Sequence, residues 1–174
     1  VGEGVPVGVL NDLWRYDVAS GTWLWVAGDA AIETAGRYGT RGVASSATAP
    51  GARDVAAAWT DCSGNLWLFG GDGFDGAGAA GYLGDLWMYS MQTGLWTWVG
   101  GASERDRPPV YGTRGVAAAA NTPGARAYAM TWTDAAGDFW LFGGYGYDTR
   151  GADGFLSDLW RLDPDTGWWT WVSG

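Results

Sequence analysis

The chain has 174 residues, 14 of them tryptophan and 31 glycine, and a formal net charge of −9. The sequence shows nothing like the clustered cations of a nucleic-acid-binding surface, and its single cysteine excludes an intrachain disulfide. No run approaches the ~20 apolar residues of a membrane helix, so we expect neither a nucleic-acid partner nor membrane insertion. Abundant tryptophan and glycine predict many short strands joined by tight turns.

A repeat of 73 residues organises the chain. The tripeptide Asp-Leu-Trp begins at Asp12, Asp85 and Asp158, and residues 28–100 are identical to residues 101–173 at 38 of 73 positions without a gap. A long period without insertions indicates one supersecondary unit that stacks on copies of itself.

We therefore divide the chain into the second half of a unit at 1–27 and two full units at 28–100 and 101–174. The half unit supplies two strands, and each full unit supplies four. The expected strands are 53–60, 65–70, 83–89 and 96–99 in the first full unit and 126–133, 138–143, 156–162 and 169–172 in the second. Apolar residues alternate in the last strand of each unit, and no stretch keeps helical periodicity over ten residues. The pattern predicts an all-β fold of four-stranded antiparallel sheets.

Thirteen of the 14 tryptophans occupy repeated positions. They are Trp14, Trp23, Trp25, Trp59, Trp67, Trp87, Trp96, Trp98, Trp132, Trp140, Trp160, Trp169 and Trp171. Fixed strand positions for such large side chains are what packing of one sheet on the next requires, so we expect these residues to be structural.

Three features recur in the same order in each unit. A Gly-Gly pair closes the second strand, an aromatic residue lies in the third, and a tryptophan follows a Thr-Gly turn in the fourth. The glycine pairs are Gly70 and Gly71, and Gly143 and Gly144. The combined pattern resembles the kelch repeat family over residues 9–174. It looks like the long bacterial variety, although Leu162 replaces the usual tyrosine and the period exceeds the ~50 residues of an ordinary kelch unit.

The resemblance implies kelch-type β-propeller blades, about two and a half of them in this chain, with the first strand of each blade lining a central channel. Closed propellers need about four to eight blades. The pattern is already under way at the first residue, so we interpret the chain as a mature or cut segment. We expect further blades from the same parent chain or from identical chains. Open stacking is the remaining interpretation, although it exposes tryptophan-rich sheet edges to aggregation.

The absence of histidine from the sequence excludes a Ser-His-Asp triad, a Cys-His pair and histidine metal sites within this chain. Four aspartates recur between the units, namely Asp61, Asp85, Asp134 and Asp158. A catalytic carboxylate pair would be unique, so we interpret the repeated ones as turn formers or as partners of repeated arginines. We expect a protein that is not an enzyme.

Two repeated arginines, Arg53 and Arg126, head the first strand of each full unit. In the kelch family this position lies near the channel mouth, where the pair could line an anion-binding pocket. The other interpretation is that each clamps a neighbouring blade's carboxylate while stacking on tryptophan. Further ligand-binding candidates are Arg41, Arg114, Tyr38 and Tyr111. They belong to a faithfully repeated loop, which we expect to pack across a neighbouring blade.

Two glycine-rich loops, 70–75 and 143–148, match the GGxGxD pattern of calcium β-rolls. They lie 73 residues apart, so they cannot share ions as the turns of a roll do. One weak Ca²⁺ held through Asp72, Asp75 or Asp148 is one interpretation, and a glycine bend with an aspartate turn is the other. We expect no other cofactor.

Function is expected in the segments that differ between the units. Residues 29–37 share no residue with 102–110, and the loops at 72–82 and 145–155 also vary. Loops on a rigid scaffold carry recognition. The first hypothesis is a binding or scaffold module at the cell surface or outside the cell that recognises a protein or glycan. The alternatives are a structural subunit of a self-assembling filament or surface layer, and part of a propeller enzyme with catalytic residues outside this segment.

Overall fold

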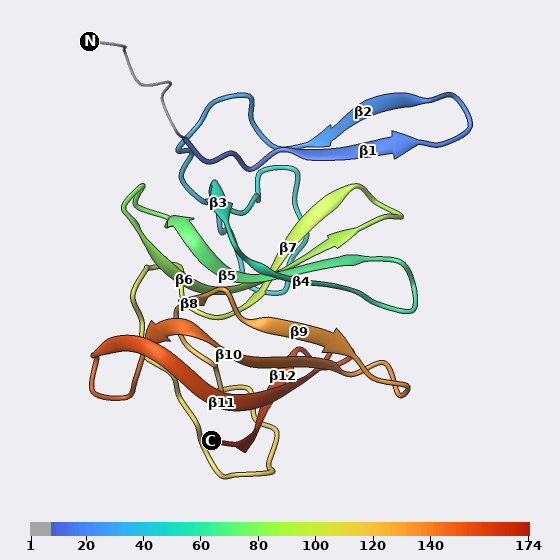
Figure 1. Cartoon of the computed structure of the whole chain (residues 1–174). Helices are drawn as coiled ribbons and strands as arrows, with labels where there is room; N and C mark the ends of the chain where they lie inside the picture. Colours follow the sequence, from blue (N-terminus) through green and yellow to red (C-terminus); the bar gives the residue numbers. More distant parts are fainter. Residues whose placement is uncertain (1–7) are drawn as a thin grey trace.

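The computed structural model describes residues 8–174, which form three antiparallel sheets and no helix (Figure 1). The first seven residues of the predicted half unit lie outside the described residues. The strands are β1 (Leu13–Asp17), β2 (Thr22–Ala27), β3 (Arg53–Asp54), β4 (Ala57–Thr60), β5 (Leu66–Phe74), β6 (Ala80–Ser90), β7 (Leu95–Gly100), β8 (Arg126–Ala127), β9 (Met130–Thr133), β10 (Phe139–Tyr147), β11 (Asp153–Asp163) and β12 (Trp168–Ser173). This architecture confirms the predicted all-β fold of antiparallel sheets.

The strand order is the same in the two large sheets. β1 and β2 form a two-stranded ribbon, which we call the first sheet. In the second sheet β5 pairs with β3 and β4 on one side and with β6 on the other, and β7 pairs with β6. The third sheet repeats this order with β8 to β12. In Figure 1 the three sheets lie one above another in the order of the chain.

The strands differ from the prediction at the glycine pairs. Gly70 and Gly71 were expected to close a strand, but β5 continues through them to Phe74 with a bulge between Phe69 and Gly71. Both glycines have positive φ, and a Cβ on Gly71 would lie 2.6 Å from the carbonyl oxygen of Asp54. Glycine therefore lets the strand bend against its neighbour instead of ending. The same bend divides the predicted strand 53–60 into β3 and β4.

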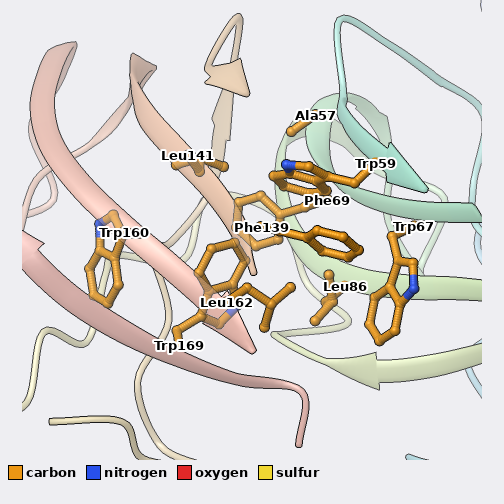
Figure 2. Close-up of a cluster of buried hydrophobic side chains, with 10 residues drawn as sticks. All are labelled: Ala57, Trp59, Trp67, Phe69, Leu86, Phe139, Leu141, Trp160, Leu162 and Trp169. Carbon is orange, nitrogen blue, oxygen red and sulfur yellow. The ribbon is translucent and has the colours of Figure 1, made fainter. Parts of the chain in front are cut away.

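An aromatic core joins the second sheet to the third. Figure 2 shows its buried side chains, which are Ala57, Trp59, Trp67, Phe69, Leu86, Phe139, Leu141, Trp160, Leu162 and Trp169. The indole of Trp59 stacks on Phe139 with ring centroids 5.4 Å apart. The rings of Phe69 and Trp169 pack edge to face with centroids 5.1 Å apart. Such contacts add to the free energy of apolar burial, so this interface is the main link between the two sheets.

The repeated tryptophans are not equally buried. Six are buried, namely Trp59, Trp67, Trp87, Trp96, Trp160 and Trp169. Three are half-buried, namely Trp98, Trp140 and Trp171. Four are exposed, namely Trp14, Trp23, Trp25 and Trp132. Burial is therefore complete only where two sheets face each other, and the exposed tryptophans lie on the two outermost sheets.

Candidate functional site

Arg53, the first residue of β3 in the second sheet, is part of a buried polar cluster. Arg53 donates from Nη1 and Nη2 to the two carboxylate oxygens of Asp85, at 2.6 and 2.8 Å. Oδ2 of Asp85 also accepts bonds from the Tyr38 hydroxyl at 2.8 Å and from Nε1 of Trp87 at 2.6 Å. Arg53 also donates from Nε to the carbonyl oxygen of Gly51 and from Nη1 to the carbonyl oxygen of Gly70. The guanidinium is thus held by bidentate geometry inside the protein.

The third sheet builds the same cluster from the second unit. Arg126 donates to Asp158 at 2.7 and 2.9 Å, and Asp158 accepts bonds from Tyr111 at 2.9 Å and Trp160 at 2.7 Å. Arg126 also bonds the carbonyls of Gly143 and Pro123. Each carboxylate belongs to the same sheet as its arginine. The expected clamp therefore exists, but it lies within one sheet and not across two, and neither guanidinium stacks on a tryptophan in the described chain.

Charge pairing governs the protonation of these clusters. Burial alone would raise the pKa of Asp85, but the charge and hydrogen bonds of Arg53, with those of Trp87 and Tyr38, hold it below its ordinary value. Burial likewise raises the pKa of Asp158 and Arg126 lowers it, and the resulting pKa again lies below its ordinary value. Burial and the facing carboxylate raise the pKa of Tyr111 to about 12. At neutral pH each carboxylate is therefore ionised and each phenol remains a donor.

These lowered pKa values predict loss of stability in acid. The folded state binds protons at Asp85 and Asp158 less readily than the unfolded state. The contribution of these carboxylates to the free energy of unfolding is therefore present above about pH 4 and is lost as the pH falls further. We expect the urea midpoint to fall steeply below pH 4 and little between pH 5 and 8. Urea titrations followed by tryptophan fluorescence at several pH values measure this. A midpoint unchanged at pH 3 would contradict the role of the pairs.

The repeated loops carry Arg41 and Arg114 to the outer edges of the large sheets. Arg41 lies over the Trp98 ring, 4.5 Å from its centroid, and donates to the carbonyl of Gly101. Arg114 lies over Trp171 at 5.9 Å. Arg41 also lines a cavity of about 360 Å³ with Trp98 and Glu104. Each loop thus packs on the sheet of its own unit, and Arg41 keeps an accessible face.

The aspartates of the glycine-rich loops form turns. Asp75 is buried, and its carboxylate accepts bonds from the backbone N–H groups of Ala77, Ala79 and Arg105. Asp148 accepts the corresponding bonds from Arg150 and Ala152.

Asp72 lies apart from these turns and is the one exposed residue of β5. Within residues 8–174, no three His, Cys, Asp or Glu side chains are grouped so that they could hold a metal ion. The calcium hypothesis stays a prediction.

Aromatic and acidic side chains from both units meet where the two large sheets adjoin. The ring of Tyr82 on β6 lies 5.7 Å from that of Tyr145 and 6.2 Å from that of Tyr147, both on β10. The Tyr145 hydroxyl donates to Asp153 at 2.7 Å, and the exposed ring of Phe155 meets Tyr145 edge-on at 5.2 Å. We call Tyr82, Tyr145, Tyr147 and Phe155, with Asp72, Asp106 and Asp153, the tyrosine surface.

The variable segment 102–110 completes the tyrosine surface. Asp106 and Tyr82 exchange two hydrogen bonds, from the Asp106 N–H to the Tyr82 carbonyl at 2.7 Å and from the Tyr82 N–H to Oδ1 of Asp106 at 3.0 Å. Burial raises the pKa of Asp72, and the nearby carboxylates of Asp54 and Asp106 raise it further. Asp106 forms an ion pair with Arg105 at 2.6 Å, whereas neither Asp72 nor Asp153 is in an ion pair within residues 8–174.

Sequence comparison between the units pointed to the loops of this surface but not to the surface itself. Position 72 is aspartate and its repeat equivalent is Tyr145, while Tyr82 corresponds to Phe155. The other candidates, Arg53, Arg126, Tyr38 and Tyr111, belong to the internal clusters.

No helix within residues 8–174 is long and apolar enough to cross a membrane. No protein-family model and no curated protein matches the chain. The fold is similar to the solved structure of YjhT, with a TM-score of 0.55 and 16% sequence identity, over 97% of this chain and 52% of that one. At this identity the similarity concerns the fold alone. The chain spans about half the length of the YjhT structure.

Proposed function

We propose that the chain is a non-enzymatic binding module of the kelch-type β-propeller kind, at the cell surface or outside the cell, which recognises a protein or glycan through its variable loops. The repeated strand order, β3/β4–β5–β6–β7 and β8/β9–β10–β11–β12, supports the assignment of the two large sheets as blades. The observation that carries the binding function is the tyrosine surface. It gathers aromatic rings at positions where the two units differ, while identical positions build the buried clusters and most of the core.

The chemistry of the tyrosine surface favours a basic protein segment as the ligand. Tyrosine rings offer flat faces and hydroxyls at low cost in side-chain entropy. Lysine and arginine side chains interact with such faces through cation–π contacts and with Asp72 and Asp153 through ion pairs. Burial raises the pKa of Asp72, and repulsion from nearby carboxylates, which a bound cation would relieve, raises it further. Carboxylates and aromatic rings can bind a neutral sugar as well, which makes a glycan the other outcome of the test.

Binding is tested with the 174-residue chain on an array of basic peptides and on an array of glycans. We expect retention of basic peptides, with affinity that falls as salt rises because the charges are exposed. The change from Tyr145 to alanine should weaken binding roughly tenfold. Tyr82→Phe is the conservative control, because Phe155 occupies the equivalent position, and Val18→Ala changes an exposed side chain in the turn of another sheet.

If the chain retains glycans but no basic peptide, the ligand is a sugar and not a basic protein segment. Equal binding by wild type and Tyr145→Ala would overturn the assignment of the tyrosine surface, as would retention on neither array.

A further inference from the structure

Two outer faces of the molecule expose rows of aromatic and apolar side chains. The outer face of the first sheet, which we call the head face, consists of Trp14, Tyr16, Trp23 and Trp25. The outer face of β9 and β10, which we call the tail face, consists of Met130, Trp132, Trp140 and Phe142. Trp23 is 65% exposed, Trp132 43% and Phe142 38%. Contiguous exposed apolar side chains of this size mark interaction surfaces.

The repeat relates each exposed face to side chains that are buried between two sheets elsewhere in the chain. Shifted back by one period, the tail face corresponds to Ala57, Trp59, Trp67 and Phe69, which the second sheet buries against the third. Shifted forward by two periods, the head face corresponds to Trp160, Leu162, Trp169 and Trp171, which the third sheet presents to the second. The tail face is therefore a copy of one side of an interface that this chain already forms, and the head face is a copy of the part of the other side that β11 and β12 supply.

Individual contacts of that interface define the missing partners. In the core, Phe69 and Trp59 both meet the Trp169 ring, with centroids 5.1 and 6.3 Å apart. Their equivalents are Phe142 and Trp132 on the tail face and Trp23 on the head face. These side chains cannot meet within one chain, because the first and third sheets lie on opposite sides of the second (Figure 1).

We propose that a second copy of the chain docks its tail face on the head face of the first, so that Phe142 and Trp132 of one copy pack on Trp23 of the other. The faces are complementary to each other and not to themselves, so the contact is head-to-tail. It would repeat the interface that the second and third sheets form within one chain.

The same geometry gives an expected size for the assembly. Each chain occupies three sheet positions, so two copies occupy six, within the range of about four to eight at which propellers close. This closure rests on the proposed propeller arrangement, whereas the head-to-tail contact does not. We therefore expect a ring of two copies with two identical contacts, which removes both aromatic faces from water.

Analytical ultracentrifugation of the 174-residue chain at micromolar concentration tests the proposal. The wild-type protein is expected at twice the mass of one chain. Trp23→Glu and Trp132→Glu place a charge on the head and tail face, and each should raise the dissociation constant at least roughly 30-fold. Val18→Glu is the matched control, because Val18 is exposed in the turn of the same ribbon but lies outside the head face. Near-ultraviolet circular dichroism verifies the fold of each variant.

Mixing the two charged variants separates head-to-tail docking from other arrangements. The Trp132→Glu chain keeps its head face and the Trp23→Glu chain keeps its tail face, so an equimolar mixture should regain one intact contact and associate. Monomeric wild-type protein would overturn the proposal in favour of further blades from a longer parent chain. Loss of association in only one of the two variants would also overturn it, since that result indicates like faces in contact. Open polymers would support the contact and overturn the closure.

Discussion

Replacing Asp158 with alanine is expected to lower the free energy of unfolding by about 3–5 kcal/mol, because it leaves the charge of Arg126 inside the protein without a counter-ion. The two side chains are 4% and 0% exposed and share two hydrogen bonds. Tyr111 and Trp160 would lose their acceptor as well. Small domains are stable by about 5–15 kcal/mol in total, so this one change removes a large part of the margin.

Urea titration followed by tryptophan fluorescence measures the loss as a lower midpoint with an unchanged slope. The control is Asp138→Ala, because Asp138 makes a long, partly exposed ion pair with Arg161 at 3.4 Å. Pairs of this kind contribute about 0–1 kcal/mol. The double change Arg126→Met with Asp158→Leu removes both charges and should be less harmful than Asp158→Ala alone. Equal midpoints for Asp158→Ala and Asp138→Ala would show that the buried pair contributes little.

The periodic sequence predicted this cluster only in part. A repeated arginine and a repeated aspartate indicated an ion pair, but Arg53 is equally compatible in sequence with Asp12, Asp85 and Asp158. A period of 73 residues fixes which residue types meet and leaves open which copy supplies the partner. The choice depends on how β3 and β6 flank β5 within one sheet, which is a property of strand order and not of local pattern.

The sequence also predicted the tyrosine surface only in part, but from differences between the units and not from identities. Differences between the units identified its loops, because positions that need not be identical are not fixed by sheet packing. The meeting of Tyr82 with Tyr145, 5.7 Å apart, depends on how one sheet is placed on the next. The exposed tryptophans escaped prediction for a related reason. Trp14 shares the Asp-Leu-Trp context of Trp87 and Trp160. It lacks both a facing sheet and the loop tyrosine that packs on each of the other two, which is Tyr38 for Trp87 and Tyr111 for Trp160.

Three equivalent tryptophans therefore allow burial to be compared with the same indole–aspartate hydrogen bond present in each. Trp14, Trp87 and Trp160 each donate from Nε1 to the aspartate two residues earlier, at 2.6, 2.6 and 2.7 Å. Trp87 and Trp160 are 0% exposed, whereas Trp14 is 47% exposed. Trp87→Ala and Trp160→Ala should each cost about 3–5 kcal/mol of unfolding free energy, since they leave large cavities. Trp14→Ala should cost less than about 1 kcal/mol in dilute solution.

Concentration separates the intrinsic cost of each change from its effect on association. If the head face is covered by a second copy, Trp14→Ala should lower the melting temperature only at concentrations where wild-type chains associate, because binding stabilises the folded state by mass action. Trp160→Ala should lower it at every concentration, because its indole is buried within one chain. Thermal melts from nanomolar to tens of micromolar protein measure both. A concentration-independent cost for Trp14→Ala equal to that of Trp160→Ala would mean that local chemistry, and not the facing sheet, determines what a tryptophan contributes in this repeat.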